Sequence, residues 1–365
     1  MAKVKFDEIA RECRSTFKGD KTGVAIVGLE HIVPNEMLVK NYEVDTENTF
    51  SKSFKKGQIL FGRRRAYQQK AGVATFDGIC SGDITVIEAI QGKVDKDLLP
   101  FIIQNERFFE HAVQGSAGSL SPRVKWEHLA SYEFVLPSLS EQKILADKLW
   151  AAYRLKESYK KLLAATDEMV KSRFIEMFGN PVTNPKGWKT SKIKDVAPES
   201  PSKESVDGRV WLLNLDMIES NTGKVIEKVY EDNENALSVQ PFDEGNVLFS
   251  KLRPYLNKVV IPDEPGLATT ELVPLRPKGD ILNKIFFSHL LRGDQFVNFA
   301  NDIAGGTKMP RMPLSELRKF ECILPPMEEQ MKFVAIAELA DKSKFELRKS
   351  IKTIDIVIKS LINKK

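Results

Sequence analysis

The sequence lacks long hydrophobic runs, clustered cysteines and an apolar leader. Its 365 residues contain no stretch of 18 or more apolar residues, so no membrane-spanning helix is expected. The first eight residues include charged side chains and no apolar stretch follows them, which argues against a secretory signal. The three cysteines, Cys13, Cys80 and Cys322, are far apart and form no CxxC pair. We therefore expect neither a disulfide framework nor a zinc cluster, and a reducing, cytoplasmic location.

Signatures of the common enzyme classes are also absent. The chain has no GxxxxGK[ST] phosphate loop, no GxGxxG, no HExxH and no Asn/Asp-Pro-Pro-Tyr/Phe motif of an N6-adenine methyltransferase. Asp263, after a proline, and Glu271 resemble part of a nuclease motif, but Val273 stands where that motif has a lysine. We therefore expect no metal site and no catalytic residue, and keep a nuclease with a degenerate site only as an alternative.

Basic residues are in modest excess, and their distribution is more informative than their number. The formal net charge is +5, a value that many proteins without a nucleic-acid partner reach. Residues 54–76, however, contain six basic side chains and no acidic one, and residues 250–260 contain three and no acidic one. Tyrosine, glutamine and asparagine lie among these basic residues, a mixture that suits contacts with phosphates and base edges.

The most informative positive feature is a long internal duplication. Residues 57–172 align with residues 245–360 without a gap, so one constant offset, the one that takes Gly57 to Gly245, relates the two copies. Matched residues include Arg65, Tyr67 and Lys70 with Arg253, Tyr255 and Lys258, Gly118, Pro122 and Arg123 with Gly306, Pro310 and Arg311, and Glu141 and Gln142 with Glu329 and Gln330. Solenoid repeats recur every 20–50 residues or so, which is a much shorter period. The long period indicates that a whole domain and the helix after it are duplicated.

Five segments are expected along the chain. They are a mixed α+β domain in residues 1–137, a long helix in 138–180, a linker in 181–187, a second α+β domain in 188–325 and a second long helix in 326–365. Elements expected within the domains are strands in 23–27, 84–87, 210–213 and 270–275 and helices in 98–113 and 285–300. The two domains are therefore predicted to share one α+β architecture.

The first long helix is predicted because Gly and Pro are absent from residues 138–178. Ser138 and Glu141 form a predicted capping box at its start, and Gly179 ends it. Its apolar stripe is expected to consist of Leu145, Leu149, Ala152, Leu155, Tyr159, Leu162, Thr166 and Met169. The stripe of the second helix runs from Phe333 to Leu361. The two stripes most simply cover each other in an antiparallel coiled coil, with the two domains related by a pseudo-two-fold axis.

Taken together, these motifs resemble the specificity subunit of type I restriction–modification enzymes. The resemblance covers essentially all 365 residues. The motifs are a Gly-x-hydrophobic-Leu-Phe strand with an Arg-x-Tyr loop in 57–67 and 245–255, glycine loops in 118–123 and 306–311, and Leu-Pro-x-x-x-Glu-Gln helix starts in 136–142 and 324–330. Each motif alone is weak, but their order and their repetition are specific.

The resemblance implies two target-recognition domains, each reading one half of an interrupted sequence in double-stranded DNA, and two spacer helices that set the gap. It implies a non-catalytic chain without a cofactor of its own. The implied partners are two adenine-methyltransferase subunits, which use S-adenosylmethionine, and translocase–nuclease subunits, which use ATP and Mg²⁺. A subunit of a type IIB-like system and a protein–protein adaptor remain alternatives.

Two loops in each half supply the predicted DNA contacts. In the first half they are Arg63, Arg64, Arg65, Tyr67, Gln68, Gln69 and Lys70, with Ser119, Arg123 and Lys125. In the second half they are Lys251, Arg253, Tyr255, Asn257 and Lys258, with Thr307, Lys308 and Arg311. Arginine can bind guanine, and glutamine adenine, through two hydrogen bonds. Residues shared by the halves are expected to hold the loop or the phosphates, and differing ones to read the bases. A solvated charge run, with Arg123 and Arg311 salt-bridged inside the fold, is the competing interpretation.

Overall fold

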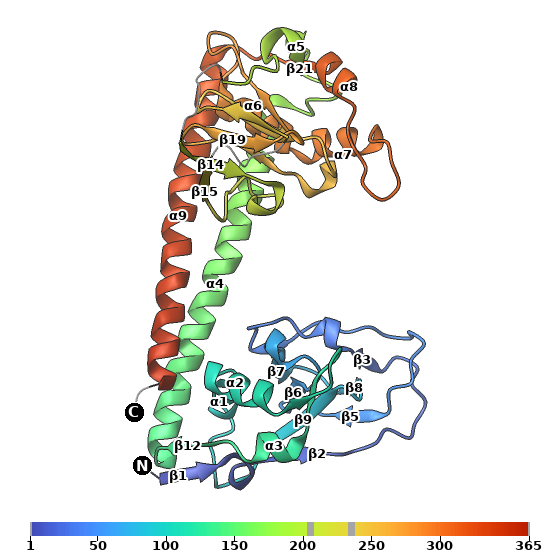
Figure 1. The fold of residues 1–365 in the computed structure, drawn as a ribbon, viewed down its shortest axis with the longest axis vertical. Coiled ribbons are helices and arrows are strands. Elements are labelled where there is room, and N and C mark those ends of the chain that lie inside the picture. The colour runs from blue at the N-terminus through green and yellow to red at the C-terminus, as the bar shows by residue number, and fades with distance from the viewer. Residues whose placement is uncertain (1, 203–207, 233–237, 364–365) are drawn as a thin grey trace. The chain divides into compact units, whose positions relative to one another are not determined.

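The computed structural model describes residues 2–202, 208–232 and 238–363, which fold into two compact units. Unit 1 comprises Met1–Lys160 and Arg348–Lys365, and unit 2 comprises Lys161–Leu347. Each unit holds one globular domain of mixed helices and strands together with one end of each long helix (Figure 1). The predicted fold class, two α+β domains joined by two long helices, is confirmed.

The domain of unit 1 is built on two sheets with a shared core. A five-stranded sheet has the order β2-β9-β6-β7-β4, antiparallel except for the β4–β7 pair, and a three-stranded sheet has the order β3-β8-β5. Phe54 of the small sheet is buried in one cluster with Leu60 and Val86 of the large one. The strands of unit 1 are β1 (Ala2–Lys5), β2 (Ala10–Cys13), β3 (Ala25–Val27), β4 (Leu38–Val39), β5 (Lys52–Phe54), β6 (Ile59–Gly62), β7 (Ala71–Ala74), β8 (Gly78–Cys80), β9 (Ile84–Ala89), β10 (Ser116–Ala117), β11 (Arg123–Val124) and β12 (Glu133–Leu136).

The domain of unit 2 follows the same plan. A four-stranded sheet has the order β15-β14-β19-β16, and a three-stranded antiparallel sheet has the order β18-β17-β20. Trp211 and Phe242 of the first sheet are buried with Leu248 of the second. The strands of unit 2 are β13 (Thr190–Lys192), β14 (Arg209–Leu213), β15 (Val229–Asp232), β16 (Val239–Phe242), β17 (Val247–Ser250), β18 (Val259–Val260), β19 (Gly266–Thr269), β20 (Leu272–Leu275) and β21 (Glu321–Ile323).

Each helix predicted within a domain is a pair of shorter helices. The short α-helices are α1 (Leu99–Ile103), α2 (Glu106–Gln114), α3 (Trp126–Ala130), α5 (Ile193–Val196), α6 (Lys284–Arg292), α7 (Asp294–Asp302) and α8 (Leu314–Lys319), and 3-10 helices used below are η2 (Leu29–His31), η3 (Ala66–Gln68), η4 (Leu215–Met217) and η6 (Pro254–Leu256). Asn105 separates α1 from α2, because its backbone is extended and its side chain accepts the amide of Arg107 at 2.9 Å. Gly293, also extended, separates α6 from α7. The predictions of one continuous helix are wrong at these two positions.

The two long helices are α4 (Leu139–Phe178) and α9 (Met327–Asn363), as predicted. Only half of the capping box forms: the Glu141 carboxylate accepts the Ser138 amide at 2.9 Å, but the Ser138 hydroxyl donates to the same carboxylate at 2.7 Å. These bonds hold the pKa of Glu141 below its ordinary value. Gly179, with φ of 75°, ends α4 as expected. In the described ranges, none of the helices is sufficiently long and apolar to cross a membrane.

A buried glutamine attaches each long helix to its own domain. The Gln142 side chain accepts the amide of Asp95 at 2.8 Å and donates to the Pro137 carbonyl at 2.9 Å. Gln330 repeats both contacts with Asn283 and Pro325, at 2.9 and 2.8 Å. The glutamine of the repeated Glu-Gln motif therefore serves the joint between helix and domain, which explains why it recurs.

The stripe buried along α4 differs from the predicted one. Leu149 is buried as expected, but Leu155, Leu162 and Met169 are about half exposed, with 45%, 51% and 47% of their surface accessible. The buried hydrophobic positions of α4 are Ala146, Leu149, Tyr153, Val170, Phe174 and Phe178. The difference arises because α4 packs against its domain as well as against α9: the Tyr153 hydroxyl, for example, reaches the Glu36 carboxylate at 3.2 Å.

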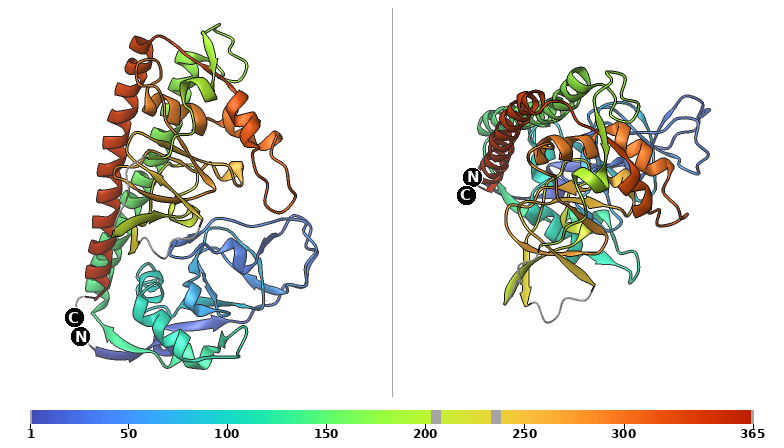
Figure 2. Two further views of the ribbon diagram at one scale, coloured as in Figure 1. Left: turned by 45° about the horizontal axis from the view of Figure 1, so that its top comes forward. Right: turned by 90° about the horizontal axis from the view of Figure 1, so that it is seen from above.

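An ion pair joins the two long helices at equivalent positions in the two units. In unit 1, Lys156 contacts Asp355 at 2.6 Å. In unit 2, Lys344 contacts Asp167 at 2.8 Å, and the offset of the duplication relates one pair to the other. In unit 1 the first half of α4 meets the end of α9, and in unit 2 its end meets the first half of α9, so the helices are antiparallel. Figure 2 shows them side by side from two further directions.

We expect Asp167→Ala to lower the free energy of unfolding by about 1–3 kcal/mol, because it removes a carboxylate from an almost fully buried ammonium group. Lys344 would retain its contact with Asp341, which limits the loss. Urea denaturation followed by circular dichroism measures the change. Glu168→Ala, at the exposed neighbouring position, is the control and should cost less than about 0.5 kcal/mol. Equal losses in both variants would show that the ion pair contributes nothing specific.

Candidate nucleic-acid interface

In each domain, the first of the two predicted DNA-contact loops is a tight loop after a buried strand. In unit 1 the loop joins β6 to β7 through η3, and in unit 2 it joins β17 to β18 through η6. Arg65 and Gln69 flank η3 with left-handed backbones, at φ of 55° and 53°. Arg253 and Asn257 flank η6 in the same way, at 50° and 47°. Left-handed backbone is uncommon for residues other than glycine, so its recurrence at four matched positions shows that the loop shape is duplicated together with its sequence.

The glycine loop of each domain is the tip of a short hairpin. In unit 1, Ala117 pairs with Arg123 across the hairpin formed by β10 and β11. In unit 2, Gly305 pairs with Arg311 through two backbone hydrogen bonds of 3.0 and 2.9 Å. Gly118 and Gly306, at the start of the two turns, have φ of 113° and 101°, which L-residues rarely adopt. Glycine at these positions is explained by the turn itself.

The two loops predicted separately lie against each other in both units. In unit 1, the Arg65 amide donates to the Pro122 carbonyl at 2.8 Å, and the Val124 amide donates to the Arg63 carbonyl at 3.0 Å. The equivalent bonds of unit 2, from Arg253 to Pro310 and from Met312 to Lys251, measure 2.7 and 2.9 Å. Each domain therefore presents one continuous surface of backbone-linked loops that carries most of the predicted contact residues.

An acidic residue contacts the hairpin arginine of each pair of loops, a role that the sequence analysis did not predict for either acid. Asp83 contacts Arg123 at 2.6 Å and Arg64 at 3.4 Å. The guanidinium of Arg123, helped by that of Arg64, holds the pKa of Asp83 below its ordinary value. Glu271, the equivalent residue of the second copy, contacts Arg311 at 3.1 Å. The same offset that relates the basic residues would have revealed this pair of acids.

Three predicted contact residues instead anchor the loops. Lys70 donates to the Leu29 carbonyl at 2.7 Å, and Lys258 donates to the carbonyl of Leu215, so both ammonium groups hold the loop to the start of a 3-10 helix. Asn257 is buried and donates to the Arg292 carbonyl at 2.8 Å. The prediction of Asn257 as a surface contact is wrong for this conformation, because its polar side chain closes the loop from within.

The remaining predicted residues are open to solvent to different degrees. Arg65, Tyr67, Ser119, Arg123, Lys125, Tyr255, Thr307, Lys308 and Arg311 are exposed, and Arg63, Arg64, Gln68, Gln69, Lys251 and Arg253 are partly buried. Arg64 donates to the Ser121 hydroxyl at 2.8 Å. Arg123 and Arg311 are salt-bridged, as the competing interpretation expected, yet nearly half of each side chain remains accessible. Contact of these residues with DNA stays a prediction.

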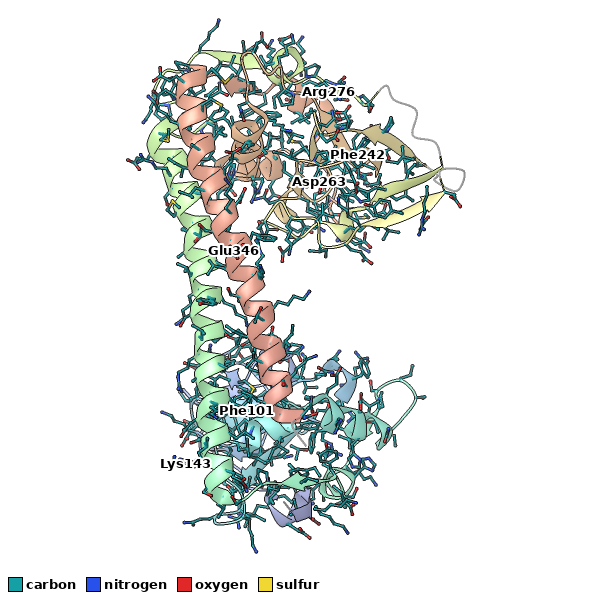
Figure 3. The ribbon with its side chains drawn as sticks, turned by 90° about the vertical axis from the view of Figure 1, so that its left-hand side faces the viewer. Phe101, Lys143, Phe242, Asp263, Arg276 and Glu346 are labelled. Carbon is teal, nitrogen blue, oxygen red and sulfur yellow. The ribbon has the colours of Figure 1, made fainter. Side chains whose placement is uncertain are left out.

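The acidic residues of the nuclease alternative do not form one site. Asp263, labelled in Figure 3, contacts Lys228 at 2.8 Å, whereas Glu271 contacts Arg311. In the described part of the chain, no group of three or more His, Cys, Asp or Glu side chains is placed to hold a metal ion. The geometry thus gives each carboxylate a separate structural partner.

Comparison with known families identifies the class of protein that carries this arrangement. The model for type I restriction modification DNA specificity domains matches residues 8–165 and 185–354. These two ranges cover most of the chain and fall on its two halves. The chain therefore belongs to the family of type I restriction–modification DNA specificity domains.

Individual relatives agree with this family. The chain is 22% identical over 295 residues to the specificity subunit of the type I restriction enzyme EcoDI from Escherichia coli. That match covers 69% of this chain and 65% of the relative, so the chain spans somewhat less than two thirds of its length.

Two solved structures are similar in fold. A type I restriction–modification S subunit from M. genitalium has a TM-score of 0.58 and 12% identity, covering 99% of this chain and 94% of that one. A chain from a structure described as showing complex assembly and conformational transition of the type I R-M system has a TM-score of 0.56 and 15% identity, covering 99% and 96%. At these identities the likeness shows the fold.

We expect Asp83→Asn to lower the free energy of unfolding by about 1–2 kcal/mol at pH 7, because the carboxylate accepts bonds from two arginines. Since folding lowers the pKa of Asp83, its stabilising effect is present above the unfolded value of about 3.9 and is lost as pH falls through the folded value. The difference between the two proteins should therefore be constant from about pH 5 to 8 and shrink below about pH 4.

Urea denaturation at each pH measures this difference. Asp97→Asn, at an exposed position of the same domain, is the matched control and should show little change at any pH. A stability difference that grew toward low pH would contradict the assigned role of Asp83.

Proposed function

We propose that this chain is the DNA-recognition subunit of a type I restriction–modification complex, and that each domain reads one half of an interrupted target. The observation that carries the proposal is the surface built twice from two loops, with the same backbone hydrogen bonds at matched positions of the duplication. A protein that reads two separate stretches of one duplex needs two such surfaces. Membership in the family supports the same function.

The loops supply chemistry for both kinds of DNA contact. Arg65 and Arg253 are shared by the two units and follow a common backbone, so we assign them to phosphates. Of the matched loop positions that differ between the units, we assign three to base reading. They are Arg63 and Lys251, Arg64 and Leu252, and Gln68 and Leu256. With this assignment, both domains bind the DNA backbone in the same way and each domain reads a different half-site.

The proposed partners supply the chemistry that this chain lacks. Two adenine-methyltransferase subunits would use S-adenosylmethionine, and translocase–nuclease subunits would use ATP and Mg²⁺. Methylation requires each target adenine to leave the base stack, so this chain acts by positioning the methyltransferases. The lengths of α4 and α9 would fix the spacer between the half-sites, as dimer geometry does in other DNA-binding proteins.

Apolar side chains left exposed on the long helices offer a docking surface for the methyltransferase subunits. In unit 1 these include Leu155 and Ile356, and in unit 2 Leu339 and Phe345, each with 45–67% of its surface accessible. Single exposed apolar residues are normal, but these lie on helices whose opposite face is already buried. A partner helix would cover them without disturbing either domain.

Arg65→Ala and Arg253→Ala are each expected to weaken duplex binding by roughly three- to tenfold and to reduce the slope of log K against log salt by about one. Fluorescence anisotropy of a labelled duplex measures both effects, with the chain in complex with its methyltransferase partner. Arg154→Ala, at an exposed position on α4 away from the loops, is the control and should change neither quantity. Binding that did not depend on salt would count against the proposal.

A further inference from the structure

The turn at the tip of each glycine loop carries an exposed apolar side chain. Leu120, in the turn between β10 and β11, has 90% of its surface accessible, more than any other large apolar side chain in the described residues. Met309, in the matching turn of unit 2, has 46% of its surface accessible. Figure 1 shows this second turn, in the loop between α7 and α8, extending beyond the helices and strands of its domain. A leucine as exposed as Leu120 gains little from burial, so folding does not explain an apolar residue at this point.

Hydrogen bonds from the basic loop hold both turns in place. In unit 1, the Arg64 guanidinium donates at 2.8 Å to the hydroxyl of Ser121, which follows the exposed leucine. In unit 2, the Arg253 amide donates at 2.7 Å to the carbonyl of Pro310, which follows the exposed methionine. Each apolar side chain therefore has a defined position relative to the basic residues predicted to contact DNA.

The two apolar residues are not at matched positions of the duplication. The offset relates Leu120 to Lys308 and Ser121 to Met309, so each turn has one apolar and one polar residue, in exchanged order. A shared packing contact would keep the apolar residue at one position, as it does in the cores of the two domains. The recurrence of an apolar group at the tip, at either of two positions, instead indicates a requirement of the surface that the tip meets.

The surroundings of each tip restrict what that surface is. Basic and hydroxyl side chains on the same loop would place it against the phosphates of a duplex, where only the bases offer apolar surface. An apolar side chain can touch the methyl group of a thymine or enter between stacked base pairs. Leucine and methionine belong to the residues that proteins insert between base pairs, and a projecting tip suits insertion. The exposed polar residues are Ser119, Arg123 and Lys125 in unit 1, and Thr307, Lys308 and Arg311 in unit 2.

We propose that Leu120 and Met309 each insert between adjacent base pairs of the half-site that their domain reads, and kink the duplex there. The inference rests on the proposed function and adds a distortion of the DNA to it. Side chains that insert in this way bend a duplex by roughly 20–90°. A base step that is already unstacked lowers the cost of flipping a base beside it, so the insertion would serve methylation as well as recognition.

The test uses the chain in complex with its methyltransferase partner and a duplex that contains the methylated motif. Leu120→Ala is expected to weaken binding roughly tenfold without changing the slope of log K against log salt, because an apolar side chain displaces no counterion. Fluorescence anisotropy measures both quantities. Energy transfer between dyes at the two ends of the duplex measures the bend, which should be smaller with Leu120→Ala and smaller again when Met309→Ala is added.

Two matched variants complete the test. Leu120→Met, which keeps an apolar side chain, should retain affinity and bend, and Val135→Ala, at an exposed apolar position of the same domain outside the loops, should change neither. Wild-type affinity and bend in Leu120→Ala would overturn the inference and leave the proposed function standing. Lost affinity with an unchanged bend would also overturn it, because it indicates contact with a thymine methyl group. A parent complex that bound the duplex no better than unrelated DNA would contradict the proposed function together with the inference.

Discussion

A largely buried lysine on one long helix facing an aspartate on the other, once in each unit, is the contact on which the helix pairing depends. Lys156 meets Asp355 in unit 1, and Lys344 meets Asp167 in unit 2. Sliding one helix by a turn, about 5.4 Å, would separate each pair and leave an ammonium group buried without that carboxylate. Polar pairs of this kind specify register in helix pairs, even where their net contribution to stability is small. In each unit the lysine–aspartate pair determines which turn of α4 faces which turn of α9. It thereby positions the part of the helix pair to which the domain is attached.

The need to hold one conformation also explains which residues of the two loops are shared by both units. The residues that both units keep are those that the loop conformation needs: the left-handed arginine, the lysine that reaches a 3-10 helix, the turn glycine and the salt-bridged arginine of the hairpin. The acid beneath the loops keeps its charge but changes its length, as Asp83 in one unit and Glu271 in the other. Because the backbone bonds do not involve the side chains of Arg63 or Gln68, these two positions can change without loss of the scaffold, whereas Arg64 also contacts Asp83 and Ser121. A duplicated chain can in this way keep one architecture and read two different sequences.

Most of the architecture could be predicted because it is repeated. The duplication and the absence of Gly and Pro over 138–178 sufficed for two domains and two long helices. The buried stripe of α4 was not predictable in the same way. Leu155 and Tyr153 both fit a helical periodicity of apolar positions, and only the packing of the domain determines which of them is buried. The helix breaks at Asn105 and Gly293 depend on backbone conformations that a periodic pattern does not reveal.

For the loops predicted to contact DNA, too, the sequence predicted one part of the arrangement and only the fold shows the rest. Charge clustering identified two loops that the fold brings together, but it could not distinguish a surface lysine from Lys70, whose ammonium group turns inward to a carbonyl. Asn257 was predicted at the surface because the sequence does not show that its side chain turns inward to the Arg292 carbonyl. The carboxylates Asp83 and Glu271 are a matched pair in the duplication, but only the fold shows that each contacts a loop arginine. The bases that the loops would read are a property of the complex with DNA, which neither the pattern nor the packing of one chain contains.

The most direct test of the account is to map N6-methyladenine in a genome exposed to the chain and its methyltransferase partner, comparing the parent with a triple variant. The variant carries Arg63→Lys, Arg64→Leu and Gln68→Leu, which gives the first loop the residues of the second at the three positions assigned to base reading. The account predicts one interrupted motif, methylated on both strands, for the parent. In the variant, the bases of one half should change or lose definition, while the other half and the spacing stay the same. Methylation without an interrupted motif, or loss of both halves together, would contradict the claim that two matched surfaces read two halves of one target.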